Sequence, residues 1–215
     1  MSRKKCLVIA ALLALCVCLL PVSVSAASAG SSKKYVKLYR KLLKKRRKKV
    51  TSGAYSYDFE FKSFLTLDVN RDGTPELVIK NQDADVSIAG VMVYTVKKGK
   101  LFYCGMFNSK TLYKGLSYSK KHKGIIDTWW TNGVGGSGAV LLRIPKRKHE
   151  LVQKYKAWEG AAEYGGTKMV YQIGPSLRKT SKAGYKKYCN KYFNKKNIKA
   201  RKFRANTASN RRKIK

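Results

Sequence analysis

The sequence predicts an α+β fold that is mainly β: an antiparallel β-meander sheet flanked by an N-terminal and a C-terminal amphipathic helix. Apolar and polar residues alternate with period two from Phe59 to Gly174. The connections there are short and rich in Gly, Lys and Asn, as in "KKGK" and "TNGVGGSG", which is typical of hairpins. Apolar residues at helical spacing occur only before and after this region, so parallel βαβ units are not expected.

The first 29 residues have the pattern of an export signal. Arg3, Lys4 and Lys5 precede an unbroken apolar run from Cys6 to Leu20, and small residues follow Pro21. We expect cleavage after Ala26 or Ala29. An uncleaved anchor is the alternative, but the run is shorter than the roughly 20 residues of a spanning helix. The mature chain is therefore expected to contain no transmembrane segment.

Residues 30–53 are predicted to form a basic amphipathic helix that ends at Thr51-Ser52-Gly53. Its apolar residues fall at helical spacing on one face, which we expect to pack on the sheet with the lysines in water. A membrane-surface helix is the alternative interpretation. The residues of the apolar face are Tyr35, Leu38, Tyr39, Leu42 and Leu43.

Residues 54–175 are predicted to form the antiparallel β domain. Each candidate strand is bounded by turn residues. The candidate strands are Phe59 to Asp68, Glu76 to Lys80, Val86 to Val96, Lys100 to Phe107, Gly124 to Thr131, Ala139 to Ile144, His149 to Trp158 and Lys168 to Ile173.

Residues 176–215 are predicted to form a Tyr-rich helix and a basic tail. Thr180 or Ser181 is the expected N-cap. The apolar face then recurs at i, i+3, i+4, i+7 and i+8. The end of the chain, "NTASNRRKIK", is polar and is expected to fray. The residues of the apolar face are Tyr185, Tyr188, Cys189, Tyr192 and Phe193.

A loop over residues 68–76 concentrates several of the few acidic residues of the chain. Oxygen-bearing side chains occupy positions 1, 3, 5 and 9, a Gly at position 6 permits a sharp turn, and position 7 can offer its backbone carbonyl. This pattern suits Ca²⁺, which takes six to eight oxygen ligands. The alternative is a polar turn whose acids pair with nearby lysines. The candidate ligands are Asp68, Asn70, Asp72, Thr74 and Glu76.

The segment "LDVNRDGTPELVI" resembles the calcium loop of FG-GAP and VCBS-type extracellular modules. It differs from an EF-hand, because position 12 is Ile79 and a strand is expected on each side. More of the chain is similar to small secreted proteins of Gram-positive gut bacteria, in which a helix, one such loop, a meander and a Tyr-rich helix follow one another. The resemblance implies export, a single β-rich domain and calcium at the loop. It implies no enzymatic activity.

The net charge is +37, from 48 basic and 11 acidic residues. Such a charge attracts polyanions over long range. Because export argues against a specific nucleic-acid target, the expected partners are teichoic acid, anionic glycans or an anionic lipid surface. We therefore expect a secreted, cell-wall-associated monomer.

The sequence offers no assembled catalytic site, and we expect no catalytic residue. A wall- or glycan-active hydrolase using Glu159, Glu163 or Asp127 is the first alternative, and a membrane-active cationic protein is the second. Cys104 and Cys189 remain in the mature chain. They are either one disulfide or two small buried apolar residues.

Overall fold

The computed structural model describes residues 27–52, 55–81, 90–108, 115–131, 135–146, 148–162 and 168–215. The chain divides into two compact units, residues 1–30 and residues 31–215, and the second holds every described strand. The predicted export signal up to residue 26 lies outside the described residues.

Fourteen strands and three α-helices are described in the chain. The first helix precedes the strands, and the other two lie in the C-terminal part. In chain order the elements are α2 (Ala27–Lys44), β1 (Arg47–Ser52), β2 (Tyr55–Glu60), β3 (Ser63–Leu67), β4 (Glu76–Lys80), β5 (Gly90–Lys97), β6 (Lys100–Asn108), β7 (Leu116–Ser119), β8 (Gly124–Thr131), β9 (Gly136–Arg143), β10 (Val152–Ala161), β11 (Met169–Ile173), β12 (Arg178–Thr180), α3 (Lys182–Tyr192), a 3₁₀ turn (Lys195–Asn197), β13 (Ile198–Arg201), β14 (Arg204–Ala205) and α4 (Ala208–Arg212).

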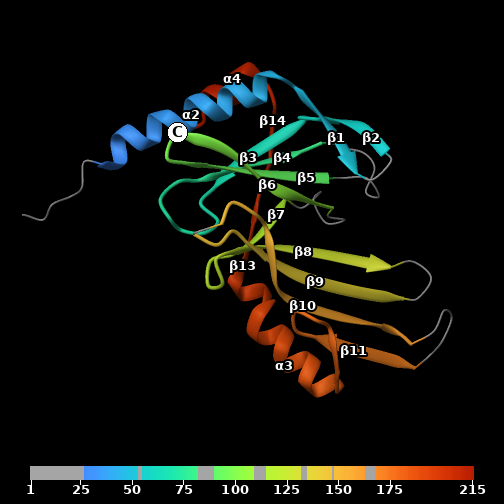
Figure 1. Cartoon of the computed structure of the whole chain (residues 1–215). Helices are drawn as coiled ribbons and strands as arrows, with labels where there is room; N and C mark the ends of the chain where they lie inside the picture. Colours follow the sequence, from blue (N-terminus) through green and yellow to red (C-terminus); the bar gives the residue numbers. More distant parts are fainter. Residues whose placement is uncertain are drawn as a thin grey trace, which may run out of the picture. The chain divides into compact units, whose positions relative to one another are not determined.

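The strands form three antiparallel sheets, which confirms the prediction of a mainly β, antiparallel protein (Figure 1). The pair β1-β2 stands alone, one five-stranded sheet has the order β14-β3-β4-β5-β6, and a seven-stranded sheet has the order β12-β11-β10-β9-β8-β7-β13. The prediction of one continuous meander sheet is wrong, because β6 is an edge strand and β7 begins a second meander. The predicted strand from Phe59 to Asp68 is also divided, since β2 pairs with β1 whereas β3 pairs with β4.

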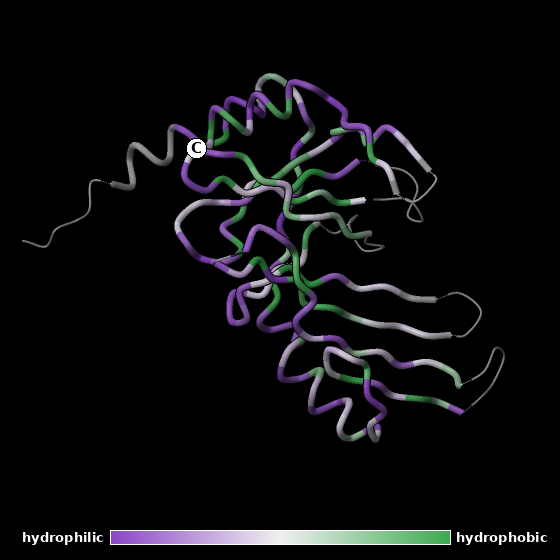
Figure 2. Tube along the Cα trace, viewed as in Figure 1, coloured by the Kyte–Doolittle hydropathy of each residue, from purple (hydrophilic) through white to green (hydrophobic). Residues whose placement is uncertain are grey.

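Two hydrophobic clusters cover the two faces of the five-stranded sheet. One cluster joins α2 to this sheet and includes the buried side chains of Tyr39, Leu43 and Leu77. The other joins the five-stranded and seven-stranded sheets and includes Val78 and Val140. Successive residues of a strand point to opposite faces, so the three consecutive apolar residues at the centre of β4, Leu77, Val78 and Ile79, are buried in the two clusters. The apolar face of α2 thus packs on a sheet, as predicted, and Figure 2 shows the alternation of apolar and polar residues along this helix.

The first helix ends at Lys44 rather than near residue 53. Arg46 adopts a left-handed conformation with φ of 61°, and the chain then enters β1. Two physical reasons explain the difference. Like charges three or four residues apart destabilise a helix, and the segment has basic residues without acidic partners. Val50 and Thr51 are β-branched and favour a strand.

The C-terminal segment does not fray, which corrects the prediction for its last ten residues. Strand β13 pairs with β7 of the seven-stranded sheet, and β14 pairs with β3 of the five-stranded sheet. The Asn206 Nδ2 group donates hydrogen bonds to the carbonyls of Leu43 and Phe61 at 3.1 and 2.8 Å. The side chain of Ile214 is only 3% exposed. The segment therefore links the two sheets, although its composition is polar.

The second amphipathic helix, α3, begins as predicted with Ser181 as its N-cap. The Ser181 Oγ atom accepts a hydrogen bond from the Gly184 backbone N–H at 3.1 Å. Tyr192 stacks on Tyr155 of β10 with ring centroids 3.9 Å apart, so the tyrosine face lies against the seven-stranded sheet. Cys189 of this helix and Cys104 of β6 are both free, so they do not form a disulfide; Cys104 is buried, as the second interpretation expects, whereas Cys189 is only partly buried.

Candidate metal centre at the loop from Asp68 to Glu76

The loop closes the hairpin of β3 and β4. Leu67 and Glu76 are directly paired across the two strands, so the residues between them form the connection. The predicted strand–loop–strand arrangement is therefore confirmed, and no helix flanks the loop as in an EF-hand. Gly73 has φ of 91°, a conformation that strains residues with a Cβ atom. This is the sharp turn that the sequence predicts.

The side chains at positions 1, 3 and 5 fold back over the loop and accept hydrogen bonds from its backbone. Asp68 accepts from the N–H groups of Asp72 and Gly73 at 3.1 and 3.0 Å. Asn70 Oδ1 also accepts from Asp72 N–H, and Asp72 Oδ1 accepts from Thr74 N–H, both at 2.9 Å. Such bonds hold the side chains in fixed orientations. They leave free lone pairs on the same oxygen atoms, because each oxygen can accept more than one bond.

Glu76 lies beneath the loop with a fully buried side chain. Its carboxylate accepts three hydrogen bonds: from Val69 N–H at 2.7 Å, from Asn70 Nδ2 at 3.3 Å and from Thr95 Oγ1 at 3.2 Å. Asn70 is only 5% exposed and contacts the Glu76 carboxylate with its amide nitrogen. The exposed part of the loop and the buried acid are thus connected through one amide side chain.

The pKa of Glu76 is raised to about 8, mainly because the carboxyl group is buried. The neighbouring carboxylates of Asp72 and Asp68 contribute to this increase, and the hydrogen bonds from Val69 and Thr95 offset only part of it. Elsewhere in the described residues, Asp58, Glu60 and Glu150 form ion pairs with basic side chains. Within the described ranges, none of the three loop carboxylates pairs with a lysine or arginine, so the pairs expected for a simple polar turn are not found there.

The oxygen ligands of the loop fit a hard cation such as Ca²⁺ if uncharged amide and carbonyl oxygens bind together with the carboxylates. Among the described residues, no three acidic, histidine or cysteine side chains converge closely enough to hold a metal by themselves. A calcium site here would therefore combine Asp68 and Asp72 with the Asn70 amide oxygen and the Thr74 carbonyl, and Glu76 would join them only if its carboxylate turned from its present hydrogen bonds toward the ion. Calcium accepts such mixed sets of carboxylate and carbonyl oxygens.

Two tyrosines from other elements hold the loop in place. Tyr39 of α2 donates a hydrogen bond to the Pro75 carbonyl at 2.8 Å. Tyr118 of β7 lies 3.4 Å from the carbonyl oxygens of Asp68 and Val69. Sequence analysis missed both tyrosines and Thr95, because each lies far from the loop in the sequence and carries no motif of its own.

The candidate acids of the hydrolase interpretation are not brought together where the structure describes them. Asp127 of β8 pairs with Val140, whereas Glu159 of β10 pairs with Ser137. Val140 and Ser137 are three residues apart on β9, so Asp127 and Glu159 point to opposite faces of the sheet. Glu163 lies outside the described residues.

Comparison of the chain with protein-family models, with curated proteins and with solved structures finds no match. In the part of the chain that the structure describes, no helix combines the length and apolar character needed to cross a membrane. Two features of this chain bear on its function, the carboxylate loop and the excess of basic side chains.

Proposed function

We propose that the protein is an exported binding protein, braced by calcium at the loop from Asp68 to Glu76 and retained at the cell surface by polyanions. In this proposal it has no catalytic activity, acts as a monomer and carries one amphipathic helix on each side of its β domain. Calcium is held by Asp68, Asn70, Asp72, the Thr74 carbonyl and Glu76. The resemblance of the loop to FG-GAP and VCBS-type calcium loops agrees with this proposal.

The observation that carries the calcium proposal is the environment of Glu76. This carboxylate is fully buried, lies near two further carboxylates and has no cationic partner in the described part of the chain. Such a group is unfavourable in its charged form. A bound divalent cation would remove this penalty for all three acids at once, which a set of backbone hydrogen bonds does not.

Calcium at this position would stabilise more than the hairpin of β3 and β4. The same loop is hydrogen-bonded to α2 through Tyr39, and Tyr118 brings the seven-stranded sheet against it. With two aspartates and no bidentate acid at position 12, we expect weak binding, with Kd of about 10⁻⁴ to 10⁻³ M. A site of that affinity is filled outside a cell, where calcium is abundant, which agrees with export.

The excess of basic side chains supports the polyanion part of the proposal. The lysines of α2 at positions 37, 41 and 44 are exposed, as are many of those in the C-terminal segment. Exposed charges of one sign attract an opposite polymer by screened long-range forces. Teichoic acid, anionic glycans and anionic lipid are the polyanions expected at the surface of a Gram-positive cell.

Thermal unfolding of the mature protein in 10 mM calcium and in EDTA tests the calcium site. When free calcium is tenfold above Kd, the expected stabilisation is about 1.4 kcal/mol, which raises Tm by a few degrees. Asp72→Asn should abolish the difference between the two conditions. Asp58→Asn is the matched control, because Asp58 is an exposed aspartate that pairs with Arg47 outside the loop.

Equal Tm values in calcium and EDTA would overturn the calcium proposal. A difference that survives in Asp72→Asn would place the metal elsewhere and would also contradict it. Retention on immobilised teichoic acid, measured against NaCl concentration, tests the polyanion part separately. Absence of retention at low salt would overturn that part alone.

A further inference from the structure

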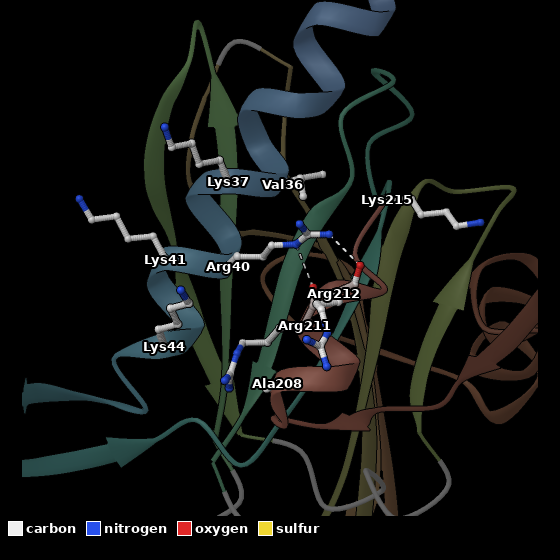
Figure 3. Close-up of a pocket in the computed structure, with 9 residues that line it drawn as sticks. All are labelled: Val36, Lys37, Arg40, Lys41, Lys44, Ala208, Arg211, Arg212 and Lys215. Atoms are coloured by element: carbon white, nitrogen blue, oxygen red, sulfur yellow. Dashed lines mark hydrogen bonds between the residues drawn. The ribbon is translucent and has the colours of Figure 1, made fainter.

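A basic groove lies between α2 and the C-terminal segment that includes α4 (Figure 3). Its volume is about 950 Å³. All of its lining residues except Val36 and Ala208 are lysine or arginine, and no acidic or aromatic residue lines it. The groove is therefore a concave surface lined mainly by basic residues.

Hydrogen bonds fix the C-terminal wall of the groove. The Arg40 guanidinium donates to three backbone carbonyls of this wall, those of Arg211 at 3.0 Å, Arg212 at 2.7 Å and Ile214 at 3.0 Å. The Tyr35 hydroxyl donates to the Lys215 carbonyl at 2.5 Å. Arg40 is thus used inside the protein and holds the C-terminal wall beside α2, as Figure 3 shows.

The helical wall presents a row of lysines. Lys37, Lys41 and Lys44 are spaced by four and three residues, so they lie along one side of α2. At 1.5 Å per residue the row extends about 10 Å along the helix. Figure 3 shows Lys37 and Lys41 projecting from α2 on the side away from Arg40. The ammonium groups of Lys37 and Lys41 thus extend into solvent and are open to a ligand.

Five basic side chains of the groove are exposed and make no hydrogen bond or ion pair within the described part of the chain. This sets them apart from Arg40 and Arg211, whose guanidinium groups are bonded to protein oxygens. Five unpaired cations around one groove repel one another until an anion binds. The five side chains are those of Lys37, Lys41, Lys44, Arg212 and Lys215.

We propose that this groove is the binding site for one linear phosphate polymer. This proposal rests on the proposed retention by polyanions and assigns that binding to the groove. A linear row of cations matches charges repeated along a chain better than it matches a single phosphate. A flat lipid surface makes poor contact with a concave groove. Because no aromatic side chain lines the groove, bases have no stacking platform, and the ligand is recognised through its phosphates.

The test compares two variants that each lose three lysine charges from one helix. The groove variant is Lys37→Gln/Lys41→Gln/Lys44→Gln. The control variant is Lys182→Gln/Lys186→Gln/Lys187→Gln, which changes exposed lysines of α3. Linear inorganic polyphosphate is the probe, and its Kd is measured by fluorescence anisotropy from 0.05 to 0.3 M NaCl. Thermal unfolding checks that both variants are folded.

We expect the groove variant to bind polyphosphate roughly 100-fold more weakly near 0.1 M salt, with the slope of log K against log salt reduced by about 2. The control variant should keep most of the affinity and a slope within about 0.7 of the unchanged protein. Equal losses in the two variants would overturn the groove while leaving diffuse polyanion retention intact.

Two further measurements separate the remaining outcomes. Tight binding of monomeric phosphate, or binding of phosphatidylglycerol vesicles in preference to polyphosphate, would overturn a linear polymer as the occupant. If the unchanged protein binds no polyanion even at 0.05 M salt, both the groove and the proposed retention fail. A selective loss in the groove variant supports the groove irrespective of the result at the calcium loop.

Discussion

The loop from Asp68 to Glu76 and the groove beside α2 hold charges of opposite sign in opposite ways. In the loop, Asp68 and Asp72 accept backbone N–H groups, and Glu76 is buried beneath them. In the groove, Lys37 and Lys41 extend into solvent without a protein partner. The first arrangement defines fixed positions for oxygen atoms, whereas the second defines a region of positive charge.

This difference indicates what kind of ligand each region suits. Fixed oxygens at short range discriminate by size and coordination, as a metal site must. Mobile ammonium groups in water tolerate irregular ligands and respond strongly to salt. We infer that the scarce acids of the chain serve stability and that the abundant bases serve attachment.

The largest effect that tests this comparison concerns the pH dependence of stability. In EDTA, the native protein keeps Glu76 protonated up to a pKa of about 8, whereas the unfolded chain loses this proton near 4.5. The native state therefore binds more protons between these values, and the free energy of unfolding falls as pH rises from about 4.5 to 8. The expected fall is several kcal/mol, because one pKa unit corresponds to about 1.4 kcal/mol. Urea unfolding at pH 5, 6.5 and 8 measures it.

Glu76→Gln provides the control, since it keeps the shape of the side chain and removes its titration. This variant should lose most of the pH dependence in EDTA. Calcium should also reduce the dependence in the unchanged protein, because a cation favours the ionised carboxylate. If the free energy of unfolding of Glu76→Gln falls by the same amount with pH, another group is responsible for the titration, and the predicted role of Glu76 is wrong.

The sequence predicted the elements whose pattern is local. Alternation predicted β8 from Gly124 to Thr131 with its observed bounds. The polar residues before the second helix placed its N-cap at Thr180 or Ser181, and the observed N-cap is Ser181. It did not predict that the meander divides into a five-stranded and a seven-stranded sheet, because β7, which begins the second of these meanders, is short and carries no long alternating pattern. Strands β13 and β14 were missed for a related reason, since they are short, basic and stabilised by pairing with distant strands.

The loop was predictable and the groove was not. The spacing of Asp68, Asn70 and Asp72 around Gly73 is a local signal, and the structure brings these residues into one turn. The groove joins residues about 170 positions apart, as in the hydrogen bond from Arg40 to the Arg211 carbonyl. The sequence alone shows that the N-terminal and C-terminal segments are basic. Only the fold shows that α2 and the C-terminal segment line the same groove.

An intermediate effect is expected when the C-terminal wall is released. Arg40→Met removes the hydrogen bonds to three carbonyls of the C-terminal segment and should lower the free energy of unfolding by about 2 kcal/mol. Limited proteolysis should then cut the segment faster. Arg212→Met is the control, because its exposed side chain has no hydrogen bond within the described residues. Equal proteolysis of the two variants would contradict a positioning role for Arg40.

The smallest effect concerns the contact between the loop and the seven-stranded sheet. Tyr118→Phe removes a hydroxyl that lies 3.4 Å from the carbonyls of Asp68 and Val69, and bonds of this length are weak. We expect a loss of about 0.5 kcal/mol in EDTA. In calcium the loss should be larger, because a looser loop binds the ion less tightly.

The control for Tyr118→Phe is Tyr103→Phe, which changes an exposed tyrosine of β6 outside the loop. Urea unfolding of both variants in calcium and in EDTA gives the four values needed. If the loop is braced jointly by the ion and by the seven-stranded sheet, only Tyr118→Phe should show a calcium-dependent loss. If Tyr118→Phe lowers the free energy of unfolding equally in calcium and in EDTA, Tyr118 contributes to packing alone. The seven-stranded sheet would then not contribute to calcium binding by the loop.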